Sequence, residues 1–330
     1  MKILIYGAGV IGSLYATRLY ENRANIEKIL PQLQTDQIDQ GTSSFQITLL
    51  ARGARYSSIK KEGVVIEHYL QQRRTREYVP VIEKVSPSDY FDFIIVIMRK
   101  NQIKEILPKL NQNISPNIVF MGNNGTCIED FKDEIDPKRI LLGFPSAGGQ
   151  REGQLIKSIY REDSPLTIGE ISGETTRRIK TLKTILETAG IQVKIAENID
   201  AWLKYHIALV SPLANGIYLA KGDNFALAKN KHAMKLMITA IKEGFRVLQD
   251  LGHPITPNYL KKLYHMPRFV LRMMLKKLMG SENGKLAMRD HAMAAPDEML
   301  QIANEFKKIK QESSIPTPSI DTLFEYLPNN

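Results

Sequence analysis

MKILIYGAGVIG, residues 1–12, is the stretch that decides the fold of this chain. Its first half is an apolar run that suits a buried parallel strand, and an amphipathic helix pattern follows the glycines directly. Gly7 permits a tight turn, Gly9 lets a pyrophosphate approach the backbone, and Gly12 lets helix and strand pack closely. The helix N-terminus then offers N–H donors to the phosphates. A glycine-rich turn without a nucleotide is the alternative. The residues predicted to bind a dinucleotide are Gly7, Gly9, Val10, Ile11 and Gly12.

The residues after the second predicted strand, 45–50, indicate which dinucleotide is bound. A site for NAD normally places Asp or Glu at the end of this strand, where it holds the ribose 2′-hydroxyl. Here the chain reads LARGAR over residues 50–55, which puts Arg52 at that place. A guanidinium suits the 2′-phosphate of NADP(H) through a charge-assisted and often bidentate contact. We therefore predict NADP(H); the alternative is that Arg52 is a solvated surface side chain.

Two later strands also end in polar residues. FDFIIVIM, residues 91–98, is followed by Arg99, and the strand predicted over residues 117–121 is followed shortly by Asn124. Ligands of doubly wound sheets bind at the carboxyl ends of the strands. Arg99 and Asn124 are therefore predicted to lie beside the cofactor, although Asn124-Gly125 taken alone indicates an ordinary turn.

The alternation of strands and helices stops near residue 197, and the later pattern is helical. The predicted fold class is α/β, with an N-terminal Rossmann-type doubly wound parallel sheet (residues 1–197) followed by an all-helical C-terminal domain (residues 198–330). Residues 21–44 are polar and delay the second strand. We interpret them as an insertion whose short helix Pro31 would interrupt. Two strand pairs are also predicted, joining 63–67 to 78–84 and 154–160 to 166–169.

Composition limits the class of protein. The chain has 330 residues, of which 43% are hydrophobic and 24% are charged, as in ordinary globular proteins. A single cysteine, Cys127, excludes an internal disulfide and fits a reducing compartment. No apolar run is long enough to cross a bilayer, and no residue spacing is typical of zinc ligands. We expect a cytoplasmic protein without a metal site.

The formal net charge of +10 calls for an explanation. It suits an enzyme whose cofactor and substrate are both anions. Residues 261–285 carry seven Lys or Arg against one Glu, interleaved with Leu, Met and Phe. This stretch could lie on a membrane surface, but the pattern favours the solvated face of packed helices, and no nucleic-acid-binding motif is present. We expect a small anionic substrate and neither a nucleic acid nor a membrane partner; a homodimer stays open.

The helical half supplies further recognisable residues. Ala201-Trp202-Leu203-Lys204 begins its first long helix, and Asp290, Glu298 and the tail SIPTP (residues 314–318) close it. With the glycine pattern, and in this order, these residues resemble the ketopantoate reductase (2-dehydropantoate 2-reductase) family over nearly the whole chain outside the insertion. Many families share the N-terminal glycines, so the specificity lies in the ordered set. The resemblance implies NADPH-dependent reduction of ketopantoate to pantoate, a step of pantothenate biosynthesis.

The resemblance also implies individual roles. Lys204, two residues after Trp202, matches the catalytic lysine, and Glu298 matches the glutamate that binds the substrate hydroxyl. Arg52 matches the arginine for the 2′-phosphate, and Asn124 matches an asparagine that contacts cofactor and substrate. Arg99 stands where the family has a lysine, so the charge is kept although the residue differs. The implied catalytic residues are Lys204 and Glu298, and the implied substrate-binding residues are Lys204, Asn124 and Glu298.

Three positions depart from the family pattern. The asparagines expected four and eight residues after the catalytic lysine are Ala208 and Pro212, and a serine expected twelve residues before the glutamate is Leu286. Because the expected residues hold ketopantoate in the family, the chemistry could survive with a different substrate. Ser211 or Asn215 could take their place after a local shift.

The implied reaction needs a proton donor beside the substrate carbonyl, and Lys204 is the candidate. Such acid catalysis is worth roughly 10²–10⁴-fold. We rank a ketopantoate reductase first, a reductase of another 2-oxo acid second, and a non-catalytic NADPH-binding sensor third. Lys204 and Glu298 favour catalysis, whereas the three departures favour the sensor.

Overall fold

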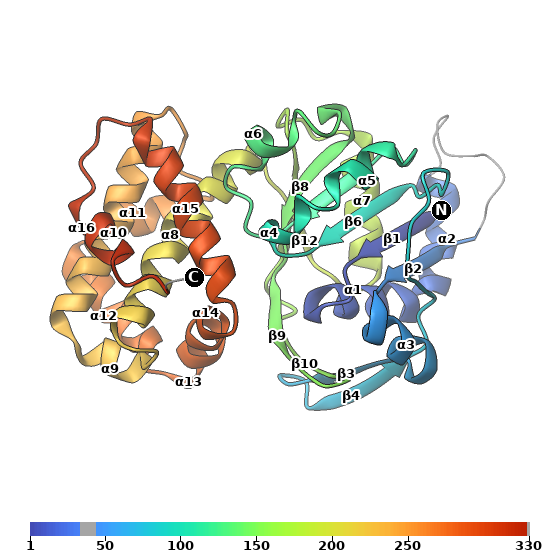
Figure 1. Ribbon diagram of the computed structural model, residues 1–330, viewed down its shortest axis with the longest axis horizontal. Helices are drawn as coiled ribbons and strands as arrows, with labels where there is room; N and C mark the ends of the chain where they lie inside the picture. The colour runs from blue at the N-terminus through green and yellow to red at the C-terminus, as the bar shows by residue number, and fades with distance from the viewer. Residues whose placement is uncertain (34–43, 329–330) are drawn as a thin grey trace. The chain divides into compact units, whose positions relative to one another are not determined.

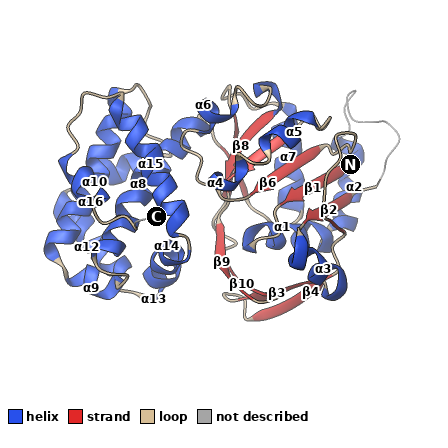
Figure 2. Cartoon of the chain, viewed as in Figure 1, coloured by secondary structure: helices blue, strands red, loops and turns tan. Residues whose placement is uncertain are grey.

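The computed structural model describes residues 1–33 and 44–328 (Figure 1). The chain forms two compact units. Unit 1 comprises Met1–Gly122 and Ile128–Ile199, and unit 2 comprises Asn123–Cys127 and Asp200–Asn330. Every strand of the described residues belongs to unit 1, whereas unit 2 is built from helices (Figure 2). Each unit buries a hydrophobic core of its own.

Unit 1 is organised around an eight-stranded sheet. Its strands are β1 (Lys2–Tyr6), β2 (Gln46–Leu50), β5 (Val81–Ile82), β6 (Phe93–Ile97), β7 (Ile118–Met121), β8 (Ile140–Phe144), β11 (Leu166–Glu170) and β12 (Val193–Ile195). Their order is β12-β11-β8-β7-β6-β1-β2-β5, and only β11 and β8 pair antiparallel. β1 lies between β2 and β6, so the carboxyl ends of β1 and β6 form the switch point of a doubly wound fold. The predicted fold class is confirmed.

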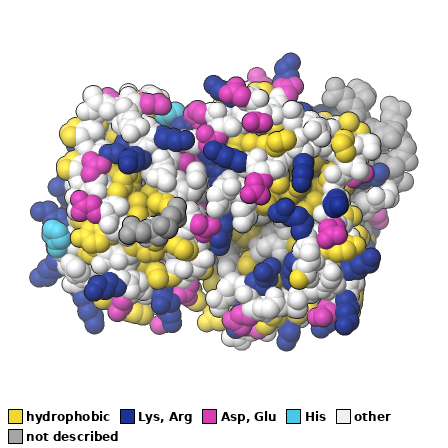
Figure 3. Space-filling model, in the orientation of Figure 1, with side chains coloured by type: hydrophobic (Ala, Val, Ile, Leu, Met, Phe, Trp, Pro, Cys, Tyr) yellow, Lys and Arg dark blue, Asp and Glu magenta, His cyan; other side chains and the backbone are white. Residues whose placement is uncertain are grey.

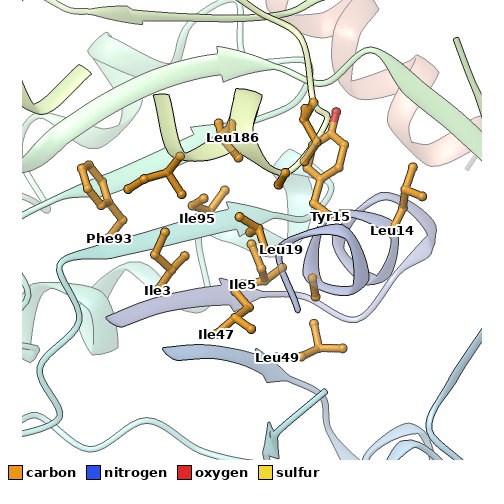
Figure 4. Packing of buried hydrophobic residues seen from close by; sticks show 14 of the residues in the cluster. Ile3, Ile5, Leu14, Tyr15, Leu19, Ile47, Leu49, Phe93, Ile95 and Leu186 are labelled. Carbon is orange, nitrogen blue, oxygen red and sulfur yellow. The ribbon is translucent and has the colours of Figure 1, made fainter. Parts of the chain in front are cut away.

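Helices cover this sheet. They are α1 (Val10–Glu21), α2 (Arg23–Leu33), α3 (Gly53–Glu62), α4 (Lys100–Ile103), α5 (Leu107–Gln112), α6 (Cys127–Phe131), η1 (Pro137–Arg139) and α7 (Arg177–Thr188). Leu14 and Leu19 of α1 and Leu186 of α7 pack in one buried cluster with Ile5 and Ile95 of the central strands (Figure 4). Burial of the central strands explains why they read as continuous apolar runs.

A second sheet in unit 1 shows that both predicted strand pairs are wrong. Its strands are β3 (Val64–His68), β4 (Arg73–Glu77), β9 (Ala147–Glu152) and β10 (Leu155–Tyr160), in the order β4-β3-β10-β9. β3 pairs with β4 and β10, while β5 joins β2 in the large sheet. β10 pairs with β9, and β11 pairs with β8. A short apolar run marks a strand, but its partner depends on segments far away in the chain.

The predicted insertion begins with a helix that continues through its proline. α2 contains Pro31 and ends at Leu33, so the prediction that Pro31 would interrupt this helix is wrong. Ile26 and Leu30 are buried in the core of unit 1. Their burial offsets the backbone hydrogen bond that a proline inside a helix removes. Residues 34–43 of the predicted insertion lie outside the described residues.

Unit 2 packs its helices around α8 and α10. The helices are α8 (Ile199–Leu219), α9 (Asn224–Lys229), α10 (Lys231–Asp250), α11 (Asn258–His265), α12 (Arg268–Met279), α13 (Glu282–Gly284), the π-helix η2 (Lys285–Arg289), α14 (Asp290–Ala294), α15 (Pro296–Gln311) and α16 (Pro318–Phe324). Tyr205 of α8 meets Phe245 of α10 edge to face, with ring centroids 5.0 Å apart. Both rings are fully buried, so α8 is held inside the helical core.

The basic 261–285 stretch forms parts of α11 and η2 and the whole of α12 and α13. Leu271, Leu275 and Met279 face the core of unit 2, while Arg272 and Lys276 are exposed. One face of α12 therefore packs on the core, as expected of packed helices, but its exposed side carries Phe269, Met273 and Met274 as well as basic side chains. On the side seen in Figure 3, Lys and Arg side chains are spread over both units among Asp and Glu. None of the helices in the described part of the chain has the length and apolar character needed to cross a membrane.

Candidate active-site residues

The glycine-rich turn follows β1 and needs two of its glycines for steric reasons. Gly7 has a φ of +123°, and a Cβ built on it would lie 2.5 Å from the backbone oxygen of Ile97. A Cβ on Gly12 would lie 1.9 Å from the backbone oxygen of Gly7. The turn therefore lies against the end of β6, and the start of α1 lies against the turn. Neither position 7 nor position 12 has space for a side chain.

Gly9 has the opposite surroundings. It is the N-cap of α1, and apart from Gly9 itself and its two chain neighbours no heavy atom lies within 4 Å of a Cβ built on it. No side chain caps this helix, and its first turn, which begins with Val10 and Ile11, holds no acidic residue. The N–H donors and the positive end of the helix dipole are therefore left for a ligand. Open space and free donors after β1 fit the diphosphate of a dinucleotide.

Arg52 is exposed at the end of β2, where it forms the N-cap of α3. Burial raises the pKa of Tyr6, the last residue of β1, and the positive charge of Arg52 partly offsets that rise. Arg52 is thus electrostatically close to the end of β1. This is where a side chain that selects between ribose 2′-hydroxyl and 2′-phosphate is needed.

Arg55, in the first turn of α3, was not among the residues predicted from the sequence. Its Nε donates to the backbone oxygen of Ala8 at 3.4 Å, and its Nη2 donates to Ser13 Oγ at 3.4 Å. Its Nη1 donates to Gln154 Oε1 at 3.1 Å. Burial, followed by the nearby charge of Arg151, lowers the pKa of Arg55 to about 10.

All four acceptors of Arg55, which include the backbone oxygen of Gln154, are uncharged, although its guanidinium is partly buried beside the glycine-rich turn. A desolvated cation with neutral partners is stabilised by an anion that binds next to it. Arg55 therefore fits a cofactor phosphate. Its place three residues after Arg52, in the same LARGAR segment, was the available signal in the sequence.

Arg99 lies at the carboxyl end of β6, as the residue before α4. Its neighbour Lys100 is buried and forms a 2.7 Å ion pair with Asp130, so this second cation has a structural role within unit 1. The side chain of Met98 contacts the glycine-rich turn, because a Cβ on Gly7 would lie 3.1 Å from Met98 Cγ. The segment that carries Arg99 therefore borders the candidate cofactor site.

Asn124 belongs to the loop that follows β7. This loop, Asn123–Cys127, is part of unit 2. The neighbouring Asn123 Nδ2 donates to Glu298 Oε1 at 2.6 Å, and the Thr126 backbone N–H donates to Glu305 Oε2 at 3.2 Å. Both acceptors lie on α15, so this helix holds the loop at two points. Asn124 between them is 1% exposed, and neither of its amide atoms has a hydrogen-bond partner within the described residues.

Lys204 lies in the second turn of α8 and is 3% exposed. Its ammonium donates to Asp200 Oδ1, one turn earlier, and His253 Nδ1 lies 4.0 Å from the other oxygen of this carboxylate. Asp200 was not among the predicted residues, although an acid four residues before a lysine on a helix is a recognisable signal. The ring of Trp202 stacks on His206 with centroids 5.3 Å apart. Burial lowers the pKa of His206 to about 4, so this stack is neutral at pH 7.

Glu298 lies in the first turn of α15, after Pro296 at its start. Acidic residues are favoured there by the helix dipole. Its bond from Asn123 links two segments that are far apart in the sequence. The structure therefore brings Glu298 and the Asn123–Asn124 pair together within unit 2.

The departures from the family pattern have a packing explanation at one position. Ala208 faces α10, because a Cβ built on Gly244 would lie 3.3 Å from the Cβ of Ala208 and 3.2 Å from Phe306 Cζ. Ala208 is also 1% exposed, so we expect a larger residue at position 208 to displace its neighbours at this crossing. Pro212 lies inside α8, and Leu286 lies in the half-buried π-helix η2.

Known proteins share this sequence pattern. The family model described as Ketopantoate reductase PanE/ApbA matches residues 3–173. The 2-dehydropantoate 2-reductase of Pyrococcus horikoshii is 23% identical over 257 residues, which cover 76% of this chain and 75% of that protein. The uncharacterized oxidoreductase YkpB of Bacillus subtilis is 22% identical over 299 residues, which cover 88% of this chain and 89% of that protein.

Solved structures share the fold over the whole length. The ternary structure of D-mandelate dehydrogenase with NADH and anilino(oxo)acetate has a TM-score of 0.74 at 16% identity, covering 99% of this chain and 97% of that one. The 2-dehydropantoate 2-reductase from Geobacter metallireducens GS-15 also has a TM-score of 0.74, at 15% identity, covering 99% of both chains.

Proposed function

Because this chain belongs to the ketopantoate reductase family of NADP-dependent oxidoreductases that act on a CH–OH group, we propose that it reduces ketopantoate to pantoate with NADPH. The observation that carries the proposal is the buried Lys204, held by Asp200 in the position that matches the family's catalytic lysine. This reaction assigns the protein to pantothenate biosynthesis.

The residues of unit 1 bind the cofactor in this proposal. The N–H groups at the start of α1 hold the diphosphate, and the space at Gly9 admits it. Arg52 and Arg55 supply positive charge for the remaining phosphate, which favours NADPH over NADH. When bound, NADPH supplies the hydride for the carbonyl carbon of the substrate.

The residues of unit 2 act on the substrate. As negative charge develops on the carbonyl oxygen, the Lys204 ammonium donates a proton to that oxygen. The carbonyl oxygen of the substrate thereby becomes a hydroxyl group. Asp200 holds the ammonium in place between turnovers. Glu298, oriented by Asn123, accepts a hydrogen bond from the substrate hydroxyl.

The experiment is a comparison of NADPH oxidation with ketopantoate in the wild type and in Lys204→Ala. We expect the variant to lose at least about 10²-fold in kcat, the size of a general-acid contribution. NADPH binding, followed by fluorescence titration, should change little, because Lys204 is not among the residues proposed to hold the cofactor phosphates. Lys229→Ala removes an exposed lysine at the end of α9 and serves as the control of equal charge. Equal loss of turnover and NADPH binding in Lys204→Ala would argue for a structural role.

A reductase of another 2-oxo acid is the second candidate. It is favoured by Ala208, which occupies a position where the family commonly has a substrate-binding asparagine. A panel of 2-oxo acids that includes aryl compounds tests it: turnover on another acid alone would keep the mechanism and change the substrate. Tight NADPH binding without turnover on any acid would instead support a sensor.

A further inference from the structure

α12 carries large apolar side chains on the side that faces away from the core of unit 2. Phe269 and Met273 are each 60% exposed, Met274 is 52% exposed and Leu278 is 39% exposed. Single exposed apolar residues are normal on a protein surface, whereas several on one face of a helix form a patch. Such patches mark binding surfaces, so the exposed face of α12 calls for a partner.

The helical period places this patch opposite the residues that α12 buries. Leu271, Leu275 and Met279 form the buried row. At about 100° per residue, Met273 points about 160° away from the middle of that row and Phe269 about 120° away. A helix that only covers a core has polar residues there. The sequence pattern favoured a solvated face, and the exposure of these two side chains revises that interpretation.

The basic residues of this region have no acidic partners. Residues 251–281 contain six Lys or Arg and no Asp or Glu. Those on α12 are exposed, and within the described part of the chain none of the six forms an ion pair. They are Lys261, Lys262, Arg268, Arg272, Lys276 and Lys277.

The acidic residues of the neighbouring helices are engaged elsewhere. α12 packs against α9, α10 and α13. Asp223 caps the start of α9, and Glu282 of α13 pairs with the start of η2. Glu243 and Asp250 of α10 accept hydrogen bonds from residues 313–320. The exposed face of α12 therefore keeps its positive charge.

Charge complementarity and apolar exposure together select the kind of partner. A second copy of the same face would bring cations against cations, which repel. Nucleic acid offers phosphates, but its backbone gives exposed Met and Leu side chains nothing apolar to pack on. A membrane surface with anionic lipids offers both headgroup charge and an acyl boundary.

We propose that the exposed face of α12 docks on a membrane surface that contains anionic lipids. Phe269 and Met273 enter the boundary between headgroups and acyl chains, while Arg272 and Lys276 contact the headgroup phosphates. Each basic side chain near such a surface is worth about fivefold in affinity. The docking uses none of the residues assigned to the reductase reaction, so it adds a place of action to the proposed function.

The charge contribution is tested by sedimentation with phosphatidylcholine vesicles, prepared with and without phosphatidylglycerol. We expect the wild type to bind the anionic vesicles at least about tenfold more tightly than the neutral ones, and to lose this preference at high salt. The double variant Arg272→Gln/Lys276→Gln should bind the anionic vesicles about 10–30-fold more weakly. Lys307→Gln/Lys308→Gln on α15 removes the same charge from exposed lysines and should change the affinity little.

The apolar contribution is tested by Phe269→Ser/Met273→Ser, which keeps every charge. We expect this double variant to bind the anionic vesicles at least about tenfold more weakly. Phe269→Trp reports insertion directly, because tryptophan emission shifts to the blue as the ring leaves water. The single native tryptophan, Trp202, is 8% exposed and supplies a constant background. Reductase activity and Tm without vesicles should be unchanged in these variants, since each alters only exposed side chains outside the candidate active site.

Three results overturn the inference. The first is absence of binding to the anionic vesicles, or binding that Phe269→Ser/Met273→Ser retains in full. The second is a dimer of the wild type in analytical ultracentrifugation that becomes a monomer in this double variant, which identifies a second copy as the occupant. The third is salt-sensitive binding to duplex DNA without binding to vesicles, which identifies nucleic acid as the partner.

Discussion

Lys204 donates a hydrogen bond to Asp200, one turn earlier on α8, and both side chains are largely shielded from solvent. The pair fixes the position of the ammonium in the second turn of α8. A shielded ion pair holds its geometry better than an exposed one, because water and salt screen it less. In this protein, α8 thus carries both the proton donor and the group that positions it.

Asp200→Asn should lower kcat for ketopantoate by about tenfold with little change in KM. The amide cannot hold the ammonium by charge, so Lys204 spends less time in the orientation that donates its proton. Steady-state kinetics measure the two parameters separately. Glu282→Gln breaks the exposed ion pair with Lys285 and is the control. A rise in KM with constant kcat would contradict the positioning role.

Arg55→Ala should weaken NADPH binding by roughly 10–100-fold, the value of a hydrogen bond to a charged group. NADH binding should weaken less if Arg55 contacts the 2′-phosphate, and equally if it contacts the diphosphate. Fluorescence titration of both cofactors distinguishes these outcomes. Lys61→Ala removes one positive charge at the other end of α3 and should leave both affinities unchanged. An unchanged NADPH affinity in Arg55→Ala would exclude a phosphate contact.

Gly9→Ala and Gly12→Ala should separate cofactor binding from folding. The Cβ at position 9 meets open space, so we expect a stable protein with at least about tenfold weaker NADPH binding. The Cβ at position 12 would overlap the backbone oxygen of Gly7, so we expect the free energy of unfolding to fall by about 1–3 kcal/mol. Denaturant unfolding and NADPH titration of both variants provide the check. Equal stabilities would show that α1 can move away from the turn.

Ala208→Asn restores the residue that the family commonly has, yet it should not improve catalysis. Ala208 is 1% exposed and lies close to Gly244 at the α8–α10 crossing. We expect a loss of about 1–3 kcal/mol in stability from overpacking and a buried amide. Denaturant unfolding and kcat/KM for ketopantoate test this expectation, and a stable variant with higher kcat/KM would refute it.

The stability of unit 1 should decrease in mild acid because of His68. Burial lowers the pKa of His68 to about 4, and the charges of Arg73 and Arg18 add to this effect. The unfolded chain, with a histidine pKa near 6.5, binds the proton first. The contribution of neutral His68 to the free energy of unfolding is therefore complete above about pH 6.5. It is lost as the pH falls toward 4, by up to ~1.4 kcal/mol per pH unit. His68→Gln should give a shallower pH dependence of the unfolding free energy; an identical dependence would exclude this role.

The sequence was informative where structure and chemistry are local. The strand, glycine turn and helix at the N-terminus lie within 21 residues, so their steric requirements appear directly in the order of residues. The alternation of strands and helices likewise predicted the doubly wound sheet and the helical half. The roles assigned to Lys204 and Glu298 came from the family resemblance and stay predictions for the experiments above.

Tertiary structure decided whatever depends on partners far away in the chain. The pairing of β3 with β10 joins segments about 90 residues apart and is set by the register of a sheet that no short pattern describes. Asn123 reaches Glu298 across 175 positions. Folding also brings Arg55 beside Ala8 and Ala208 against Gly244, and neither contact could be inferred from the sequence. The sequence specifies the type of each side chain. The fold determines which residues surround it, and these neighbours set its hydrogen bonds, its burial and its pKa.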